Sequence, residues 1–308
     1  MRMSAVVVTW EGGAVTERCV ASLLAQEPPL PEIVVVDNAS GKAERSRLRE
    51  VLAGRQSVRL LLLDENRQFA GGLNAGAAAA IEGGADRLLL LNNDVVLEPD
   101  AAARLLAVLD ITPGGGIAGP RIVDLTRHEH VLSVGEYHSL PLLCLPRTLL
   151  RYRRAGDAPY LVRGVMGCAL LVTRACFEAV GGFSTEIEVY YEDVDFCLGA
   201  RERGFRAVIE PRAVVYHDGL RGFAGGLTPW AAFLKARNPW LLMRRRGGPM
   251  SWMAFVPLYG AMITASIALC ALRRRVDVAR ALGRGAIAGV RVAAGAPPTP
   301  VGPPLRGA

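Results

Sequence analysis

Three short apolar runs in the first hundred residues each end in small polar side chains. They read EIVVVDNAS (residues 32–40), RLLLLDENR (59–67) and RLLLLNND (87–94). A continuous apolar run of this length is typical of a strand that is buried on both faces. Segments with helical spacing lie between the runs, and one of them is rich in alanine. This alternation predicts a parallel sheet covered by helices, which places the chain in the α/β class.

The pattern is less regular in the second part of the chain. Residues 126–159 show no clear periodicity, whereas the segments on either side indicate further strands and helices. We expect strands at 117–118, within 161–173 and at 207–217, and helices that end at Gly181 and Gly204.

The composition limits what the chain can bind. Its 308 residues are 51% hydrophobic, enough for one large core, and its net charge of +7 comes almost entirely from arginine. Only Lys42 and Lys235 are lysines, and a net charge that comes from arginine richness is not by itself evidence for nucleic acid. We therefore do not expect a nucleic-acid partner. The six cysteines form no C-x-x-C pair, which favours a reducing compartment over a disulfide frame or a zinc site. The apolar run at residues 5–8 is too short for a signal peptide.

The polar residues after the apolar runs predict a ligand site, because ligands bind at the carboxyl ends of parallel strands. Asp94 is a candidate ligand for a divalent cation, with Asn92 and Asn93 assisting, since Mg²⁺ is usually held by one or two carboxylates and by substrate phosphates. Asp37 and Asn38 suit hydrogen bonds to a nucleobase or ribose. The alternative for each segment is an ordinary Asn/Asp turn.

A glycine-rich segment, FAGGLNAG, begins the alanine-rich helix. Its glycines, among them Gly71, would let the backbone approach a phosphate at the helix start. No G-x-G-x-x-G follows the first strand, so the segment does not match a dinucleotide-binding fingerprint.

Seven motifs between residues 6 and 240 together resemble a known enzyme family. They read VVVTW, VVVDNAS, ENRQFAGGLNAG, LLLLNNDVVLEPD, GGFSTEIEVYYEDVDFCLGARERGF, VVYHDG and KARNPW. In this order and spacing they resemble the family 2 glycosyltransferases of the GT-A fold, particularly the bacterial rhamnosyltransferase-like branch. The resemblance implies a Rossmann-like mixed sheet with helices on both faces, a nucleotide-diphospho-sugar donor, Mg²⁺ or Mn²⁺, and inversion at the anomeric carbon.

The resemblance also implies roles for individual residues. Asp193 matches the catalytic base, and its place at a helix start would stabilise the carboxylate anion. Glu192 is a supporting neighbour, and Asp195 is expected to be structural or to contact the acceptor. A plain helix-capping acid is the alternative for Asp193. His217 matches a histidine that joins Asp94 at the metal, with a structural histidine as its alternative.

The expected nucleotide contacts lie at the strand ends and in the late KARN motif. Gln68 stands where the family often has glycine or another small residue, which leaves the local phosphate geometry open. For Arg237 of the KARN motif, the alternative is an ordinary surface arginine. The predicted contacts are Thr9, Glu11, Asp37, Asn38, Asn66, Gly71, Asn74, Asn93 and Arg237.

A stretch without charged residues, 250–272, is long enough to cross a bilayer. Arginines flank it on both sides, at 244–246 and 273–275, which favours an interfacial or re-entrant helix with both ends in the cytosol over a simple span. A buried core helix is the alternative. We expect the basic run at Arg147, Arg151, Arg153 and Arg154 to meet a lipid diphosphate or to form a solvated loop, and His128 and His130 to lie in a solvated loop.

These observations predict a domain plan and a function. We expect a glycosyltransferase domain at 1–240, with a nucleotide half (1–110) and an acceptor half (111–240), then a membrane-associating tail (241–295) and a disordered end (296–308). The expected activity is transfer of a sugar, with rhamnosyl as the first candidate, to a cell-envelope glycan or polyprenyl-linked precursor at the cytoplasmic face of the membrane. A UDP- or GDP-hexose donor, a catalytically degenerate assembly scaffold and a nucleotidyltransferase are the alternatives. The last lacks support, because no lysine-rich phosphate loop follows the first strand.

Overall fold

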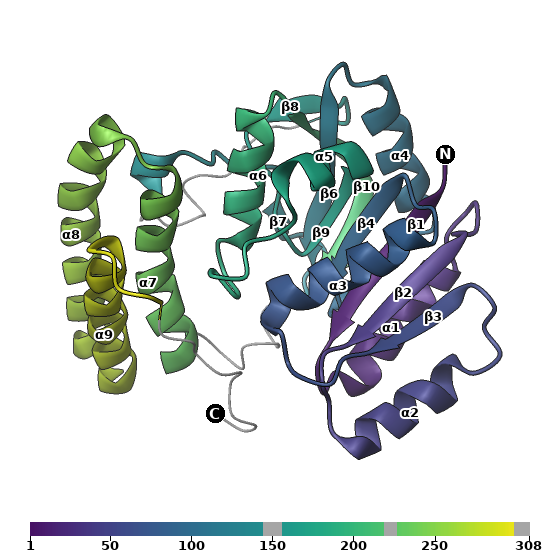
Figure 1. Ribbon diagram of the computed structural model, residues 1–308, viewed down its shortest axis with the longest axis horizontal. Helices are drawn as coiled ribbons and strands as arrows, with labels where there is room; N and C mark the ends of the chain where they lie inside the picture. Colours follow the sequence, from purple (N-terminus) through teal and green to yellow (C-terminus); the bar gives the residue numbers. More distant parts are fainter. Residues whose placement is uncertain (144–155, 219–226, 299–308) are drawn as a thin grey trace.

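The computed structural model describes residues 1–143, 156–218 and 227–298, and one mixed sheet forms the centre of the molecule (Figure 1). The strands are β1 (Met3–Thr9), β2 (Glu32–Asp37), β3 (Val58–Leu62), β4 (Arg87–Asn92), β5 (Val95–Leu97), β6 (Gly115–Asp124), β7 (Val131–Ser133), β8 (Tyr160–Val162), β9 (Ala169–Thr173) and β10 (Arg206–His217). The helices are α1 (Gly13–Leu24), α2 (Lys42–Leu52), α3 (Gln68–Glu82), α4 (Ala101–Ile111), the 3₁₀ helix η1 (Leu140–Leu142), α5 (Arg174–Val180), α6 (Glu192–Glu202), α7 (Pro229–Arg246), α8 (Pro249–Leu272) and α9 (Val276–Ala293). The predicted α/β class is therefore confirmed.

The first four strands form the parallel half of the sheet, in the order β3-β2-β1-β4. Their carboxyl ends share one edge, since Thr9 lies opposite Asp37 and Val8 lies opposite Asn92. The polar residues that follow the apolar runs therefore meet at this edge, as the sequence predicts.

The rest of the sheet is mixed. β9 runs antiparallel to β4 and β6, while β10 runs parallel to β6 and antiparallel to the short strand β5. The pairing of β5 with β10 sets Val95 opposite His217. This pairing thereby brings Asp94, the residue just before β5, next to His217 at the end of β10, although the two are far apart in the sequence.

Adjacent residues of β1 face two different cores, as expected for a strand buried on both faces. Val7 packs in a core with α1 and α4, and Val6 packs in a core with α3 and α6. Helices thus cover both faces of the sheet (Figure 1).

The glycines of α3 allow this helix to pack closely on the sheet. A Cβ atom at Gly76 would lie 2.4 Å from Val6 Cγ1, and one at Gly72 would lie 2.7 Å from Val8 Cγ1. Close helix–strand packing therefore explains these two glycines. Gly71 lies one residue earlier on the same helix, next to the Arg67 side chain.

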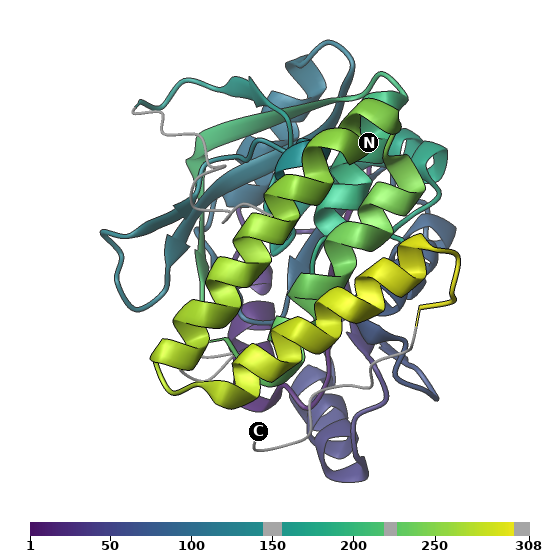
Figure 2. The ribbon, with the colours of Figure 1, turned by 90° about the vertical axis from the view of Figure 1, so that its left-hand side faces the viewer.

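The last three helices lie beside the α/β body and form a separate layer (Figures 1 and 2). α7 is largely buried, whereas only Phe255 and Tyr259 of α8 are buried. Both pack against Trp240 of α7, with ring centroids 5.2 and 5.0 Å away. The alternative of a buried core helix for residues 250–272 is therefore wrong. The proposed domain boundary at residue 240 lies inside α7 and stays a prediction.

Candidate active site

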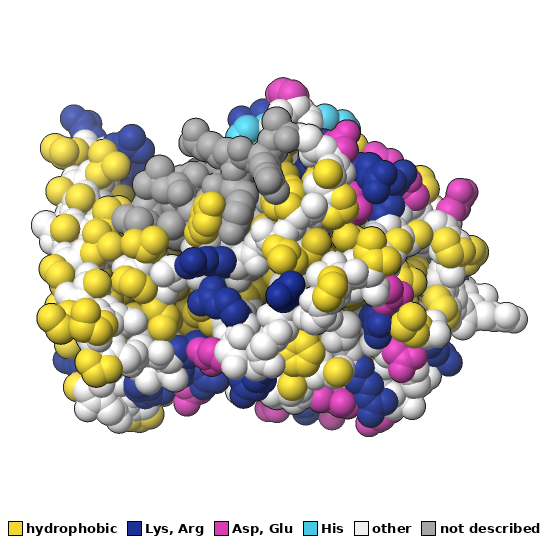
Figure 3. Space-filling view, turned by 90° about the horizontal axis from the view of Figure 1, so that it is seen from above, with side chains coloured by type: hydrophobic (Ala, Val, Ile, Leu, Met, Phe, Trp, Pro, Cys, Tyr) yellow, Lys and Arg dark blue, Asp and Glu magenta, His cyan; other side chains and the backbone are white. Residues whose placement is uncertain are grey.

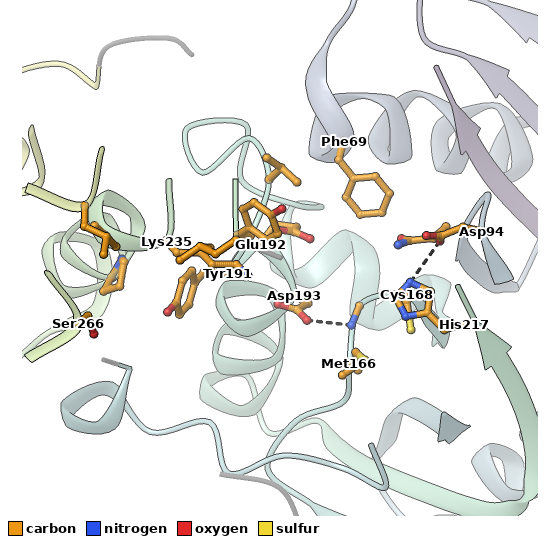
Figure 4. A pocket seen from close by; sticks show the side chains of 18 of the residues that line it. Phe69, Asp94, Met166, Cys168, Tyr191, Glu192, Asp193, His217, Lys235 and Ser266 are labelled. Carbon is orange, nitrogen blue, oxygen red and sulfur yellow. Dashed lines mark hydrogen bonds and ion pairs between the residues drawn. The ribbon is translucent and has the colours of Figure 1, made fainter. Parts of the chain in front are cut away.

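A cavity of about 780 Å³ opens at the carboxyl edge of the sheet, between the start of α6 and the layer of C-terminal helices (Figure 4). Its polar wall is formed by strand ends and by the first turn of α6, and its apolar wall by α7 and α8. The polar wall includes Asn92, Asn93, Asp94, Glu192, Asp193 and His217. The wall on the helical side includes Lys235, Pro239, Tyr259, Met262, Ile263 and Ser266.

Asp94 and His217 form a pair in this wall. Asp94 Oδ1 lies 3.2 Å from His217 Nε2, and the two side chains are 18% and 15% exposed. Burial acts against the charged forms, but contact with His217 lowers the pKa of Asp94. The neighbouring Cys168 and Asp94 raise the pKa of His217 to about 11 despite burial. Without a metal the pair is therefore a carboxylate and an imidazolium at the edge of the cavity, and a cation bound by both side chains would replace the proton on His217 Nε2.

This pair fits two positions of a divalent cation. Neighbouring ligands around a six-coordinate cation lie about 3 Å apart, which matches the separation of the two atoms. Among the residues that the structure describes, no group of three or more His, Cys, Asp or Glu side chains converges as a metal site. A cation held by Asp94 and His217 would therefore need further ligands from a substrate, as diphosphates provide.

Asp193 lies in the first turn of α6, on the same cavity (Figure 4). Its side chain is buried, and its two oxygens accept hydrogen bonds of 2.8 Å from the backbone N–H groups of Gly167 and Val194. The space is tight, because a Cβ at Gly167 would lie 2.7 Å from Asp193 Cβ. This carboxylate is thus fixed in the cavity wall and is no solvated capping acid.

The segment 166–168 joins the base candidate to the metal pair. The N–H of Gly167 binds Asp193, and the carbonyl of the next residue, Cys168, accepts from Asn92 N at 2.9 Å. Figure 4 shows this segment between Asp193 on one side and the Asp94–His217 pair on the other. No sequence motif predicts this connection, because it depends on β9 lying beside β4.

A cluster of hydroxyl and amide groups lies at the carboxyl end of β1. Thr9 Oγ1 is 2.7 Å from Thr16 Oγ1, which accepts from Asn93 Nδ2 at 3.0 Å. A Cβ at Gly12 would lie within 2.4 Å of all three groups. The structure thus brings the predicted residues Thr9 and Asn93 together, and it adds Gly12 and Thr16, which the motif analysis missed.

Asp37 is held by partners within the chain. Its fully buried carboxylate accepts from Arg45 Nε at 2.8 Å and from the backbone N–H of Ser40. Glu11 belongs to the same network, since its Oε1 accepts from Gly41 N at 2.7 Å. The sequence did not point to Arg45, because a basic residue on an arginine-rich amphipathic helix carries no distinctive signal.

Asn38 and Asn66 connect the end of β2 to the start of α3. Asn38 Nδ2 donates to Asn66 Oδ1 at 3.2 Å and to the carbonyl of Gln68 at 2.9 Å. Gln68 has a φ of 56°, in the left-handed region that favours glycine. The conformation gives a physical reason why a small residue is common here in the family that the sequence resembles.

Of the nine predicted nucleotide contacts, Asn93 is the one that lines this cavity, and Asn74 and Arg237 are among the eight that do not. Asn74 exchanges two hydrogen bonds of 2.8 Å with the backbone of Phe183. Arg237 is fully buried, and its Nη2 lies 2.9 Å from Glu188 Oε2. Their roles toward a nucleotide stay predictions, but both side chains have structural partners.

Asp195, His128 and His130 lie outside the site. Asp195 is buried and pairs with Arg246 Nε at 2.6 Å, which supports its structural interpretation. His128 and His130 are exposed, and the His128 ring packs on Tyr216. The predicted basic run at Arg147, Arg151, Arg153 and Arg154 lies outside the described residues.

Comparisons with known proteins agree with this geometry. Residues 4–154 match the family model described as Glycosyl transferase family 2. The dTDP-rhamnosyl transferase RfbF of Shigella flexneri is 23% identical over 228 residues, which are 71% of this chain and 72% of the relative. The N-acetylglucosaminyl-diphospho-decaprenol L-rhamnosyltransferase of Mycobacterium tuberculosis is 29% identical over 275 residues, which are 80% of this chain and 87% of the relative.

A solved structure shares the architecture. It is the mannosyltransferase PcManGT from Pyrobaculum calidifontis in complex with GDP-Man and Mn²⁺, with a TM-score of 0.60 at 18% identity. The match covers 94% of this chain and 87% of that one. The likeness shows a common fold over nearly the whole chain.

Proposed function

We propose that this chain is an inverting, metal-dependent rhamnosyltransferase, because residues 4–154 match the model of glycosyl transferase family 2 and the chain has the GT-A fold. The donor is dTDP-rhamnose, and the acceptor is a hydroxyl of a cell-envelope glycan or of its polyprenyl-linked precursor. The observation that carries the proposal is that one cavity holds both a fixed carboxylate, Asp193, and a metal-compatible pair, Asp94 and His217.

In this proposal Asp193 is the general base. Two backbone N–H groups hold its oxygens in place, and the carboxylate can take a proton from an acceptor hydroxyl. Attack by that hydroxyl on the face of the sugar opposite the nucleotide inverts the anomeric carbon. The apolar wall on α7 and α8 limits water at the site, which protects the donor from hydrolysis.

Asp94 and His217 would hold Mg²⁺ or Mn²⁺ beside the donor diphosphate. When bound, such a cation neutralises charge on the departing diphosphate. The pair needs little rearrangement for this role, because the pairing of β5 with β10 already sets the two side chains side by side. The cluster of Thr9, Thr16 and Asn93 lies at the neighbouring strand end, where the nucleoside part of the donor would bind.

The choice of donor and acceptor draws on the relatives. The names of the two curated relatives describe one as a dTDP-rhamnosyl transferase and the other as an L-rhamnosyltransferase with a decaprenol-linked substrate. A UDP- or GDP-hexose donor is the alternative.

We propose the cytoplasmic face of the membrane as the location, and the C-terminal layer supports attachment to a membrane. By length and composition, α8 is one helix among the described residues that could cross a membrane, with a mean hydropathy of 1.9. Figure 3 shows hydrophobic side chains gathered along the edge of the molecule that α8 forms. Arginines precede and follow the helix, as suits a helix that lies in the interface of a membrane with anionic lipids. The same helix contributes Met262 and Ile263 to the cavity, so an acceptor held in a membrane would be near the site.

Ligand binding and turnover test the proposal in two steps. Thermal unfolding is measured with dTDP, UDP and GDP, each with and without Mn²⁺, for the wild type and for Asp94→Ala. We expect a Mn²⁺-dependent stabilisation by dTDP in the wild type and none in the variant. Release of dTDP from dTDP-rhamnose is then measured with an envelope lipid extract as the acceptor source. Stabilisation by UDP or GDP alone would transfer the proposal to another donor, and absence of turnover with every nucleotide sugar would favour the scaffold alternative.

A further inference from the structure

The chain adopts an unusual conformation just before the carboxylate assigned as the base. Glu188, Tyr190 and Tyr191 have φ angles of 63°, 63° and 73°. None of them is glycine, so each occupies a left-handed conformation that is normally unfavourable and persists only when the surroundings enforce it. This loop, residues 187–191, leads directly into Glu192 and Asp193 at the start of α6.

One side chain of α7 binds the loop at three points. Asn238 is fully buried, and its Nδ2 donates to the carbonyls of Ile187, Val189 and Tyr190 at 3.1, 2.8 and 2.9 Å. The three acceptors determine the orientation of the amide. In the flipped orientation the amide oxygen would take the place of Nδ2 and face three carbonyl oxygens. A single amide group therefore contacts three carbonyls of the loop, and its two hydrogens are shared among them.

The neighbouring residue orients this amide. Arg237 Nε donates to Asn238 Oδ1 at 2.9 Å, and the Arg237 guanidinium also pairs with the Glu188 carboxylate at 2.9 Å. On the opposite side of the loop, the carbonyl of Glu188 accepts from Ala70 N of α3 at 3.1 Å. The loop is therefore held between α3 and α7, and both consecutive residues of α7 contribute.

We propose that Asn238 is a positioning residue for the transfer reaction, with Arg237 as the residue that orients it. Asn238 keeps the loop in its left-handed conformation and so fixes the start of α6, where Asp193 meets the cavity. This inference rests on the proposed function for its effect on catalysis, but the structural hold on the loop is independent of it. It gives Arg237 and Asn238 a role toward the base, in place of the diphosphate contact expected for Arg237.

The test replaces the amide by a carboxylate of the same shape. Asn238→Asp removes the three donated hydrogen bonds and places negative oxygens against three carbonyls. Gln26→Glu is the matched control, because Gln26 is also a buried amide whose Nε2 donates to two carbonyls, those of Ser22 and Glu98, at 3.1 and 2.9 Å. Gln26 lies outside the cavity, so its loss affects stability without affecting the loop.

Two measurements are made on each full-length protein. Hydrogen–deuterium exchange of peptides that cover residues 183–195 reports on the loop. Turnover of dTDP-rhamnose, together with stabilisation by dTDP and Mn²⁺, reports on catalysis and donor binding. For Asn238→Asp we expect faster exchange in this segment and a kcat about 10- to 100-fold lower, the loss expected from misplacing a reacting group by about 1 Å. The donor KM and the dTDP stabilisation stay within about twofold, since the donor site is built on other elements.

The outcomes separate this inference from the proposed function. Unchanged exchange and kcat in Asn238→Asp, or an equal loss of kcat in Gln26→Glu, would overturn the positioning role. Where Asn238→Asp does not fold, Arg237→Lys decides, because it keeps a positive charge near Glu188 and removes the bond that orients the amide. Unchanged kcat and exchange in that variant would also overturn the inference. Absence of turnover in the wild type would contradict the proposed function. Hydrogen–deuterium exchange of residues 183–195 would then still test whether Asn238 holds the loop.

Discussion

Helices α7 and α8 follow one another in the chain, yet their burial is the opposite of what their composition suggests. α7 carries five arginine and lysine residues and is largely buried, with Arg237 and Asn238 fully enclosed. α8 carries no charge over 24 residues and is mostly exposed, with Met253 and Leu272 71% and 82% exposed.

The difference shows that burial in this layer follows hydrogen bonding and function more than hydrophobicity. Two arginines that are fully or largely buried are tolerated on α7 because each has a carboxylate partner, Glu188 for Arg237 and Asp195 for Arg246. An exposed apolar helix is unfavourable in water. In the function proposed above, α7 supports the catalytic site and α8 faces the membrane.

The largest expected effect is on kcat, and it tests whether the chemistry depends on Asp193 at the start of α6. Asp193→Asn keeps the size of the side chain but removes the base, so we expect kcat to fall by roughly 10²- to 10⁴-fold. Stabilisation by dTDP and Mn²⁺ should persist, since Asp94 and His217 are unchanged. The release of dTDP measures the first effect and thermal unfolding the second. Full activity of the variant would remove Asp193 from its role and break the comparison.

The arginine runs before and after α8 allow a direct contrast between the two helices. Arg246 at the end of α7 is 10% exposed and pairs with Asp195, which is 3% exposed, whereas Arg273 after α8 is exposed. Removing Arg246 leaves the buried Asp195 carboxylate with only the longer contact to Arg245 Nε at 3.5 Å. We therefore expect Arg246→Ala to lower the free energy of unfolding by about 2 kcal/mol, less than for a charge left with no partner. Arg273→Ala should change it by less than about 0.5 kcal/mol. Urea denaturation of both variants measures the difference, and equal losses would contradict the contrast.

A buried ion pair on the other side of α6 extends the comparison to pH. His138 Nε2 lies 2.9 Å from Glu136 Oε2, and both side chains are buried. Burial lowers the pKa of His138, but hydrogen bonds to Cys197 and Glu136 outweigh it and raise the pKa to about 9. A raised pKa means that the folded state binds the proton more tightly, so this stabilisation is complete below about pH 6.5 and is lost as the pH rises through about 9.

Glu136→Gln tests this pH dependence. We expect the variant to be less stable than the wild type by about 2 kcal/mol at pH 6.5 and by much less at pH 9.5, measured by urea denaturation at both values. The same difference between the two proteins at both pH values would show that the charge on His138 does not contribute.

The smallest expected effect concerns the exposed face of α8. Met253 and Val256 are 71% and 47% exposed, and replacing both by glutamate should weaken binding to anionic phospholipid vesicles by about tenfold. Ile111→Glu is the control, since Ile111 is 77% exposed at the end of α4, far along the chain from this layer. Vesicle co-sedimentation measures binding, and thermal unfolding confirms that the proteins are folded. Equal binding by the wild type, the Met253 and Val256 double variant and Ile111→Glu would contradict a membrane role for α8.

The sequence could predict the parallel half of the sheet because each strand there is an unbroken apolar run. β5, β7 and β8 have only three residues each, too few for a pattern, and their pairing depends on distant strands. The exposed position of α8 was predicted from the arginines on both sides of residues 250–272, because the apolar composition alone is the same in a core and in a membrane.

The candidate site was predicted where a motif concentrates chemistry, as at Asp94, Asp193 and His217. The supporting residues were missed because their roles depend on the fold. Asn238 contacts residues about fifty positions earlier in the chain, and a buried asparagine in a helix leaves no sequence pattern.

The pairing of β5 with β10 has a consequence for how this chain can vary. Asp94 precedes Val95, which lies opposite His217, and side chains alternate between the two faces of a sheet. Inserting or deleting one residue within 94–97 would shift the register and turn the side chains that follow to the other face, which separates Asp94 from His217. Length changes are easier to accommodate in the exposed turn at residues 126–130. We therefore expect natural variants to tolerate a change of residue type near Asp94 and His217 more readily than a change in the number of residues between Asp94 and Leu97.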